Sequence, residues 1–575
     1  MAANMWRNTS SLAALLLALG APGVAGAQDA NQADVVLTDG DIYTPTGWAK
    51  SMALRKGVII AVGSTADIEK LAGPATRRVD LKGSAVLPGL VDSHVHVTFA
   101  GLEQFACRIT PGSPAKAIAE AVRGCTVRAK PGEWITGGNW VAAGFKSGEQ
   151  NKAFLDRIAP NNPVALIDES HHSLWVNSAA LKLAGITAKT ADPAGGVIDR
   201  DAKGEPTGLL RETAARLINA VIPAPSRDQL KAALTLSSGQ MLSYGITAFA
   251  DAGITAADVG AMSELSASGM LKQRVRGCMR WTPLAGDAPA ANGMALIDSR
   301  AAYSTDRFHL DCVKVVLDGV PTESRTAFML DPYLVHGHGD APTRGLPMIK
   351  PELLNPAIAN FDRMGLTVKF HAVGDAAVRE AIDSVAYARK TNGWGGPSHD
   401  VGHNSFVAIE DVKRVRDLHM IWEFSPYIWY PTPIAAKDIR GVIGDERMKR
   451  WIPIRDAVET DALVVAGSDW SVVPSVNPWI AIETMVTRQV PGGSAETLGE
   501  GQKITLEQAM RIFTENGARY LGQRQLFGSL ESGMKADFIV VERNPFKVPT
   551  TEIHKTRVLE TYIEGEKVYA AKQPS

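Results

Sequence analysis

Between residues 88 and 520, short apolar runs alternate with longer segments in which apolar residues recur at helical spacing. Apolar runs of strand length separated by helical segments are typical of a parallel β-sheet. Eight units of this kind predict an α/β fold of the TIM type, a (β/α)8 barrel whose active site lies where the strands end. The runs end at His96, Asp251, Arg280, Asp318, His371, His403, Phe424 and Asp469.

Both ends of the chain show a different pattern, in which short strands are separated by polar turns. The predicted strands cover residues 33–40, 51–63, 536–541 and 558–565, and the second is a hairpin that turns near Lys56 and Gly57. We therefore expect one small β-sandwich domain, built from residues 28–87 and 521–575, beside a barrel formed by residues 88–520.

The segment from about residue 100 to residue 240 is longer than an ordinary connection between a strand and a helix. We expect it to form an inserted subdomain that covers the barrel mouth.

The first 27 residues have the features of a secretory signal peptide. Arg7 precedes an apolar run over residues 12–19, and Ala25-Gly26-Ala27 supplies a small-residue cleavage site. The alternative is an uncleaved membrane anchor, but the apolar core is short for a membrane span. We expect a mature protein that starts near Gln28 and is periplasmic or secreted.

The composition of the 575 residues is that of an ordinary globular protein, with 45% hydrophobic and 21% charged residues. The formal net charge of −1 gives no reason to expect nucleic acid or an anionic membrane as partner. We expect a small-molecule substrate and no membrane contact after signal cleavage. The sequence leaves open whether the protein forms a homodimer.

The chain has four cysteines. Cys107 and Cys125 lie close together without the spacing of metal ligands, and in an oxidising compartment they either form a disulfide or stay free. Cys278 and Cys312 lie in strand-like runs and are expected to be buried thiols.

Residues with metal-binding side chains gather at the predicted strand ends. His94 and His96 are two positions apart on one strand, so both imidazoles point to the same face. Imidazole and carboxylate side chains suit Zn²⁺ and related divalent ions. The full candidate set is His94, His96, Lys314, His371, His403 and Asp469.

Lys314 is unusual in this set because a lysine in an apolar barrel strand is costly unless something uses it. Burial favours the neutral amine, which can add carbon dioxide and form a carbamate that bridges two cations. Lys369 shares a strand face with His371 and is the alternative buried lysine. His399 shares the face of His403 but lies deeper, which makes it the poorer ligand.

Each of these residues also has an ordinary structural explanation. A single histidine at a strand end is more often hydrogen-bonded than metal-bound, Lys314 could pair with Asp318, and Asp469 could cap the following segment. The joint pattern favours a metal site, because the residues fall in successive strands in the order that one shared mouth requires.

This pattern resembles the amidohydrolase superfamily, and within it the amidohydrolase-3-type group that includes N-substituted formamide deformylases. The resemblance covers nearly the whole mature chain. Its motifs are residues 87–96, 172–181, 195–196, 204–208, 318–319, 325–327, 371–375, 467–470 and 528–537.

The resemblance implies hydrolysis of a carbon–nitrogen bond, in an amide, formamide or carbamate-like compound, by water activated on one or two divalent metal ions, with zinc as the expected metal. It implies Asp469 as the catalytic acid–base, His371 and His403 as ligands or oxyanion partners, and Lys314 as the N6-carboxylated bridge. Two positions depart from the group. Gly402 replaces a glutamate that would support a ligand, and Ser471 replaces a proline.

The sequence carries less information about the substrate. Aromatic residues in the seventh predicted strand and its loop could line an apolar pocket or pack in the core, and Arg325 could bind a carboxylate or pair with Glu323. The candidate substrate contacts are His172, Trp175, Asn177, Arg325, Tyr427 and Trp429.

Two other functions are compatible with the fold. One is a non-catalytic binding or regulatory protein, against which the intact ligand set argues. The other is a deaminase of the same superfamily, which Lys314 and the export signal disfavour.

Overall fold

The structure is a computed structural model that describes residues 32–572, with gaps at residues 111–112, 141–148, 169–172, 194–195, 213, 284–291, 323–324, 336–341 and 426–428. The predicted signal peptide, residues 1–27, lies outside the described residues. Within the described part, no helix combines the length and the apolar character needed to cross a membrane.

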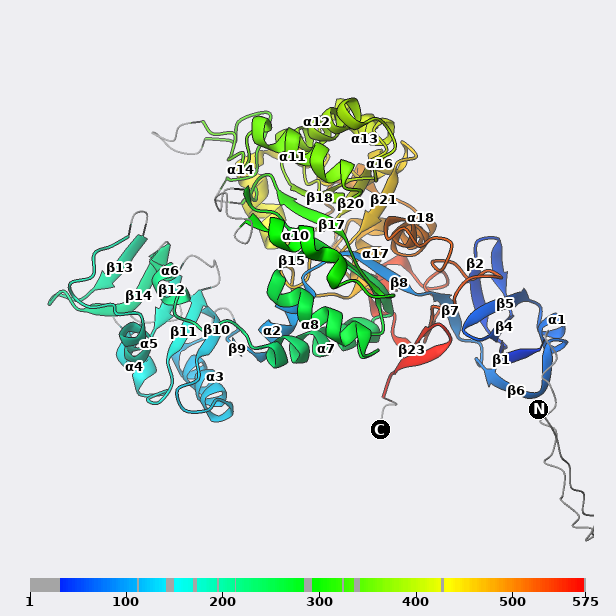
Figure 1. Ribbon diagram of the computed structural model, residues 1–575, viewed down its shortest axis with the longest axis horizontal. Helices are drawn as coiled ribbons and strands as arrows, with labels where there is room; N and C mark the ends of the chain where they lie inside the picture. The colour runs from blue at the N-terminus through cyan, green and yellow to red at the C-terminus, as the bar shows by residue number, and fades with distance from the viewer. Residues whose placement is uncertain are drawn as a thin grey trace, which may run out of the picture.

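Eight parallel strands form the barrel at the centre of the molecule (Figure 1), and all eight lie where the apolar runs predict them. Neighbouring strands in the sheet follow one another in the chain, as a (β/α)8 barrel requires. In order they are β8 (Leu90–Val95), β15 (Ile246–Ile254), β16 (Arg274–Arg280), β17 (Phe308–Val316), β18 (Thr367–Ala372), β19 (Asp400–His403), β20 (Ile421–Phe424) and β21 (Leu463–Ala466).

The segment that follows β21 closes the barrel against β8. The N–H of His96 donates to the carbonyl of Trp470 at 2.8 Å, and the N–H of Asp469 donates to the carbonyl of His94 at 2.7 Å. A Cβ on Gly467 would lie 2.2 Å from the backbone nitrogen of His94, so only glycine permits this close approach.

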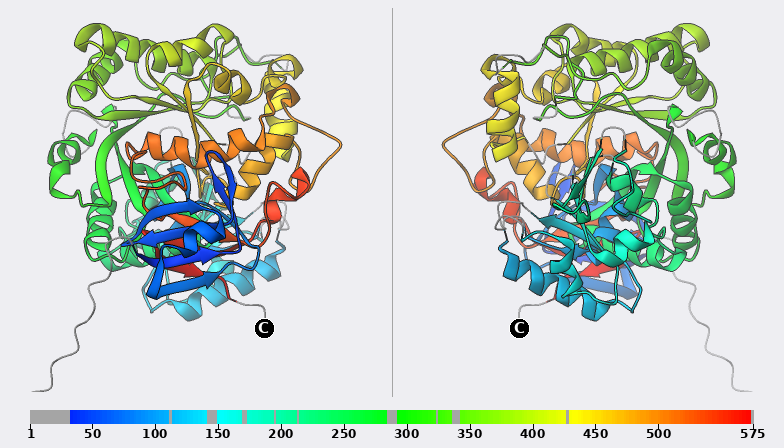
Figure 2. Two further views of the ribbon diagram at one scale, coloured as in Figure 1. Left: turned by 90° about the vertical axis from the view of Figure 1, so that its right-hand side faces the viewer. Right: turned by 90° about the vertical axis from the view of Figure 1, so that its left-hand side faces the viewer.

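Helices surround the barrel sheet (Figure 2) and share one extensive apolar core with its strands. Several have clear start signals, such as the capping box of Ser226 and Gln229 before α7. These helices are α2 (Val97–Phe105), α7 (Arg227–Ser243), α8 (Ala256–Ala267), α10 (Met294–Ser299), α11 (Pro351–Arg363), α12 (Asp375–Asn392), α13 (Val412–Asp417), α14 (Arg440–Ile443), α15 (Asp445–Met448), α16 (Ile454–Val458), α17 (Pro478–Thr487), α18 (Leu506–Phe513) and α19 (Glu515–Tyr520).

Strands from both chain ends lie side by side in a β-sandwich (Figure 2), as the sequence predicts. One sheet has the order β5 (Val58–Gly63), β4 (Ser51–Arg55), β1 (Ala33–Thr38), β6 (Ala72–Asp80). The other has the order β24 (Glu566–Ala570), β23 (Val558–Ile563), β22 (Phe538–Val541), β7 (Ala85–Pro88), β2 (Asp41–Thr44), β3 (Gly47–Ala49). Buried residues of both sheets, such as Leu37, Met52 and Phe538, form one core, and α1 (Thr65–Glu69) lies beside them.

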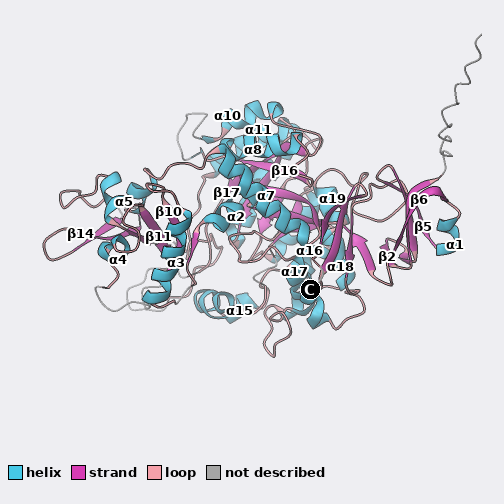
Figure 3. Ribbon diagram, turned by 90° about the horizontal axis from the view of Figure 1, so that it is seen from below, coloured by secondary structure: helices cyan, strands magenta, loops and turns pink. Residues whose placement is uncertain are grey.

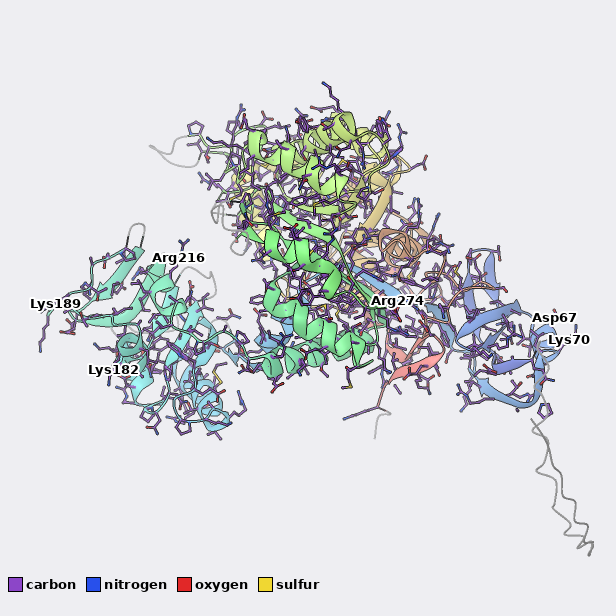
Figure 4. The ribbon with its side chains drawn as sticks, in the orientation of Figure 1. Asp67, Lys70, Lys182, Lys189, Arg216 and Arg274 are labelled. Atoms are coloured by element: carbon purple, nitrogen blue, oxygen red, sulfur yellow. A yellow bond between two sulfur atoms is a disulfide. The ribbon has the colours of Figure 1, made fainter. Side chains whose placement is uncertain are left out.

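The sandwich is attached to the end of the barrel opposite the metal-binding residues. Arg274, which is labelled in Figure 4, begins β16. Its guanidinium contacts Asp537 at 3.2 Å and Glu564 at 2.8 Å. Because these acids belong to the C-terminal part of the sandwich, the ion pairs hold the two domains together and leave the mouth free.

The segment after α2 forms a separate subdomain with its own sheet and its own apolar cores. Figures 1 and 3 show it as a lobe set apart from the barrel sheet, and its position over the mouth stays a prediction. It forms a lobe of its own because its cores contain only residues of the insertion. Its elements are β9 (Cys107–Arg108), α3 (Ala115–Arg128), β10 (Ile135–Trp140), α4 (Lys152–Asp156), β11 (Val164–Asp168), β12 (Ser173–Val176), α5 (Ser178–Leu183), β13 (Gly196–Arg200), β14 (Pro206–Glu212) and α6 (Ala215–Asn219).

All four cysteines form disulfides. Cys107 and Cys125 join β9 to α3 inside the insertion, which decides between the two alternatives left open by the sequence. Cys278 and Cys312 also form a disulfide, so their prediction as buried thiols was wrong. Register explains the error, because these cysteines are direct neighbours on β16 and β17.

Candidate metal centre

Three predicted ligands meet where the first and last strands close the barrel. Nε2 of His94 lies 3.7 Å from Oδ1 of Asp469, and Nε2 of His96 lies 3.3 Å from the same oxygen. One ligand atom from each residue falls within a group no wider than 4.8 Å. A cluster of two imidazole nitrogens and a carboxylate oxygen at this spacing fits a divalent cation.

Lys314 joins this cluster from β17. Its Nζ lies 3.2 Å from Nε2 of His94, and the side chain is buried. Burial lowers the pKa of Lys314 to about 8, so the neutral amine is within reach near neutral pH. Asp318, the alternative partner for Lys314, instead accepts hydrogen bonds from the backbone of Val373 and Gly374.

His371 and His403 complete the predicted set on the neighbouring strands. Their ring centroids are 4.3 Å apart, and that of His403 lies 4.7 Å from that of His94. Nε2 of His403 is buried and has no hydrogen-bond partner among the described residues. A buried nitrogen without a partner is costly, and a metal ion at this position would satisfy it.

Burial keeps all three inner imidazoles neutral. It lowers the pKa of His371 to about 4 and the pKa values of His94 and His403 well below the usual range for histidine. A neutral imidazole offers a lone pair to a metal ion, whereas a protonated one does not. The electrostatics of the mouth therefore fit a cation site.

The backbone at two of these residues takes an uncommon conformation. His403 and Asp469 have left-handed φ angles of 73° and 56°. Such angles are rare outside glycine and occur preferentially at functional sites. Here they turn side chains at the ends of β19 and β21 toward the shared mouth.

Glu423 supports the centre from β20, and the sequence analysis missed it. Nδ1 of His94 and Oε2 of Glu423 share a hydrogen bond of 2.6 Å, which leaves Nε2 of His94 facing the other ligands. A carboxylate behind a ligating histidine fixes its tautomer and orientation. A buried acid inside an apolar strand was the available signal.

Gly402 creates the space for that carboxylate. A Cβ at this position would lie 2.6 Å from Oε2 of Glu423. The group that this chain resembles has a glutamate at the position of Gly402. His94 still has a supporting carboxylate here, because Glu423 of the neighbouring strand β20 supplies it.

Lys369 and His399, the two alternatives that the sequence offered, are held by other buried groups. Nζ of Lys369 contacts Asp400 at 3.0 Å and Glu423 at 3.7 Å, so Lys369 is the counter-ion of two buried acids. His399 accepts the N–H of Val368 at 3.0 Å and contacts Asp362 at 3.0 Å. These contacts account for the burial of Lys369 and His399 without a metal ion.

The structure brings few of the candidate substrate contacts to the mouth. Trp175 is fully buried in the core of the insertion, and its indole N–H donates to the carbonyl of Asn151. The side chain of Asn177 caps α5 and bonds to the backbone of Val164. Both residues therefore serve the packing of the insertion.

The other candidate contacts belong to barrel loops or lie outside the described part. Trp429 is fully buried, donates to the carbonyl of Ser425 and stacks against the guanidinium of Arg488. Arg325 lies in the loop after β17, where its N–H donates to the carbonyl of Thr322. His172 and Tyr427 lie outside the described residues.

A family model described as the amidohydrolase family matches residues 77–569. The chain belongs to the amidohydrolase family. Membership assigns it to a family of hydrolases, and the match includes every ligand of the candidate metal centre.

Individual proteins give the same relationship. The chain is 31% identical over 557 residues to the protein LONG AFTER FAR-RED 3 of Arabidopsis thaliana, a match that covers 93% of this chain and 92% of the relative. It is 26% identical over 528 residues to the N-substituted formamide deformylase of Arthrobacter pascens, which covers 90% of this chain and 94% of that enzyme.

A solved structure confirms the fold of this amidohydrolase. An uncharacterized metal-dependent hydrolase from Pyrococcus furiosus superposes with a TM-score of 0.72 at 23% identity, covering 89% of this chain and 100% of the other. At this identity the similarity concerns the fold alone, and the activity must be argued from the site.

Proposed function

We propose that this amidohydrolase is an exported, metal-dependent hydrolase that cleaves a non-peptide carbon–nitrogen bond in an amide, a formamide or a carbamate-like compound. The observation that carries the proposal is the convergence of the imidazoles of His94 and His96 on Asp469 where the barrel strands end. The similarity to an N-substituted formamide deformylase over most of both chains supports the same bond type.

The ligand set would hold one or two divalent ions, with zinc as the metal that best suits nitrogen and carboxylate donors. His94, His96 and Asp469 would hold one ion, and His371 and His403 a second. Lys314 would join the two sites after its neutral amine adds carbon dioxide, which forms a carbamate and releases one proton. The short distance from Lys314 to His94 supports this role.

A bound metal supplies Lewis acidity and lowers the pKa of water to about 7. The residues of the chain do the rest. Asp469 would accept a proton from the attacking water and deliver it to the leaving amine, since its two oxygens face different histidines at 3.3 Å and 3.9 Å. If only the first ion is bound, His371 or His403 would instead stabilise negative charge on the carbonyl oxygen.

Export rests on the N-terminal sequence and on the cysteines. Disulfides persist in oxidising compartments, and this chain pairs all four of its cysteines. N-terminal sequencing of the protein from periplasmic extract or culture fluid should find a start near Gln28. Recovery of the full-length chain from the cytosol would contradict export.

The proposed reaction is tested by supplying zinc to the purified protein and screening N-formyl and N-acyl amines. Release of equal amounts of amine and carboxylic acid is the expected result. Release of ammonia would instead identify a deaminase. Absence of turnover together with absence of metal binding would favour the non-catalytic alternative.

A further inference from the structure

Arg280 is the last residue of β16 and stands at the barrel mouth. Alternate residues of a strand share a face, and the two preceding positions on this face, Arg276 and Cys278, bond to Asp311 and Cys312 of β17. The strand register pairs Arg280 with Lys314. Paired residues of neighbouring strands point to the same face, and Lys314 reaches His94, so the side chain of Arg280 emerges level with the ligand cluster.

Gly253 shows how close Arg280 comes to the metal centre. A methyl group placed on Gly253 would lie 3.3 Å from Nη2 of Arg280 and 3.6 Å from Cε1 of His96. The guanidinium and the imidazole thus flank one small gap over the end of β15.

Arg280 differs from the other arginines of its strand in having no charged partner. Arg274 and Arg276 form ion pairs with acids, whereas Arg280 is exposed and has no carboxylate within ion-pair distance among the described residues. Guanidinium stays protonated at any ordinary pH and offers parallel donors that match a carboxylate. The mouth therefore presents one fixed positive charge beside the proposed reaction centre.

We propose that Arg280 binds a carboxylate of the substrate, so that the preferred substrates are N-acyl or N-formyl amino acids and not neutral amides. This inference rests on the proposed carbon–nitrogen hydrolysis and names its substrate class. A carboxylate held by Arg280 beside His96 would place the adjoining amide over Asp469, so the residue acts in specificity and in positioning.

The test compares an acid with its neutral counterpart on the full mature chain supplied with zinc. N-acetylphenylalanine and N-acetylphenethylamine differ only by the carboxylate. The parent should prefer the acid, and Arg280→Met should reduce kcat/KM for the acid by roughly 10- to 100-fold, mainly through KM, because a charge-assisted contact is lost. The same variant should leave kcat/KM for the neutral amide, N-acetylphenethylamine, within a few-fold of the parent.

Two further variants control this comparison. Arg280→Lys keeps the charge but loses the paired donors, so its activity on the acid should fall between those of the parent and Arg280→Met. Arg123→Met removes an exposed arginine of the insertion helix α3 and should change kcat/KM for neither substrate. Zinc content should be equal in all four proteins.

The outcomes separate this inference from the proposed reaction. Hydrolysis of both compounds with equal effects of Arg280→Met on each would overturn the role of Arg280 and leave the reaction standing. Hydrolysis of neither, together with no turnover of any N-formyl or N-acyl amine in the screen, would overturn the reaction. Calorimetric titration with N-acetylphenylalanine would then still decide on Arg280, because tight binding that Arg280→Met abolishes supports the site and unchanged or absent binding refutes it.

Discussion

At the scale of single residues, Asp469 is the side chain on which the proposed chemistry depends most. Asp469→Asn keeps the size of the side chain and an oxygen near the metal but loses the proton acceptor. We expect kcat to fall by roughly 10²–10⁴-fold with most of the metal retained. Steady-state kinetics and elemental analysis check this, with the exposed Asp298→Asn of α10 as control. Turnover within a few-fold of the parent would refute the role.

Lys314 tests whether a second metal site exists. Lys314→Ala removes the amine that lies 3.2 Å from His94 and leaves the other five ligands in place. If Lys314 bridges two ions, the variant should bind fewer zinc ions per chain, and acetate or propionate should restore part of the activity. Full zinc content and unchanged activity in the variant would show that Lys314 has only a packing role and bridges no metal ions.

Glu380 makes stability depend on pH. Burial, assisted by Asp318 and Asp383, raises the pKa of this α12 residue to about 7. An acid whose pKa is raised on folding stabilises the fold at low pH, where it is protonated. That contribution is lost as pH rises from the unfolded-state pKa near 4.5 through the folded-state pKa of about 7. Partial exposure limits the loss to roughly 1–2 kcal/mol.

Glu380→Gln should therefore leave the melting temperature nearly unchanged at pH 5 and raise it by about 1–2 °C at pH 8, because the unfolding entropy of a chain this long is large. Thermal unfolding of parent and variant at both pH values measures this. An equal shift at the two pH values would mean that ionisation of Glu380 is not the cause.

At the scale of elements, closure between β8 and β21 depends on Gly467. A methyl group there would lie 2.4 Å from Cβ of His94, so Gly467→Ala must push the two strands apart. We expect a loss of about 1–3 kcal/mol or more in unfolding free energy, together with weaker zinc binding. Gly441→Ala in α14 is the matched control, because nothing lies within 4 Å of its added Cβ. Equal behaviour of the two variants in urea unfolding would contradict this account.

At the scale of the whole molecule, the two disulfides stabilise different units. Cys278–Cys312 joins barrel strands across 34 residues, and Cys107–Cys125 closes 18 residues inside the insertion. Loss of either should cost roughly 3–4 kcal/mol in the unit that contains it. Paired serine variants should show this in hydrogen exchange, with Cys278→Ser/Cys312→Ser loosening the barrel and Cys107→Ser/Cys125→Ser loosening only the insertion. Uniform loosening in both variants would mean that the units do not unfold separately.

The sequence by itself determined the elements and located most residues of the candidate metal centre. Apolar periodicity located all eight barrel strands and the terminal sandwich, because secondary structure follows local spacing. The same rule put His94 and His96 on one face and Asp469 after the last strand.

Only the tertiary structure decided which distant side chains meet. The support of His94 by Glu423, the space left by Gly402, the pairing of Cys278 with Cys312 and the separate core of the insertion all depend on contacts between elements. Strand register and core packing set those contacts, and no local pattern encodes them, because a pair such as His94 and Glu423 is separated by 329 positions in the chain.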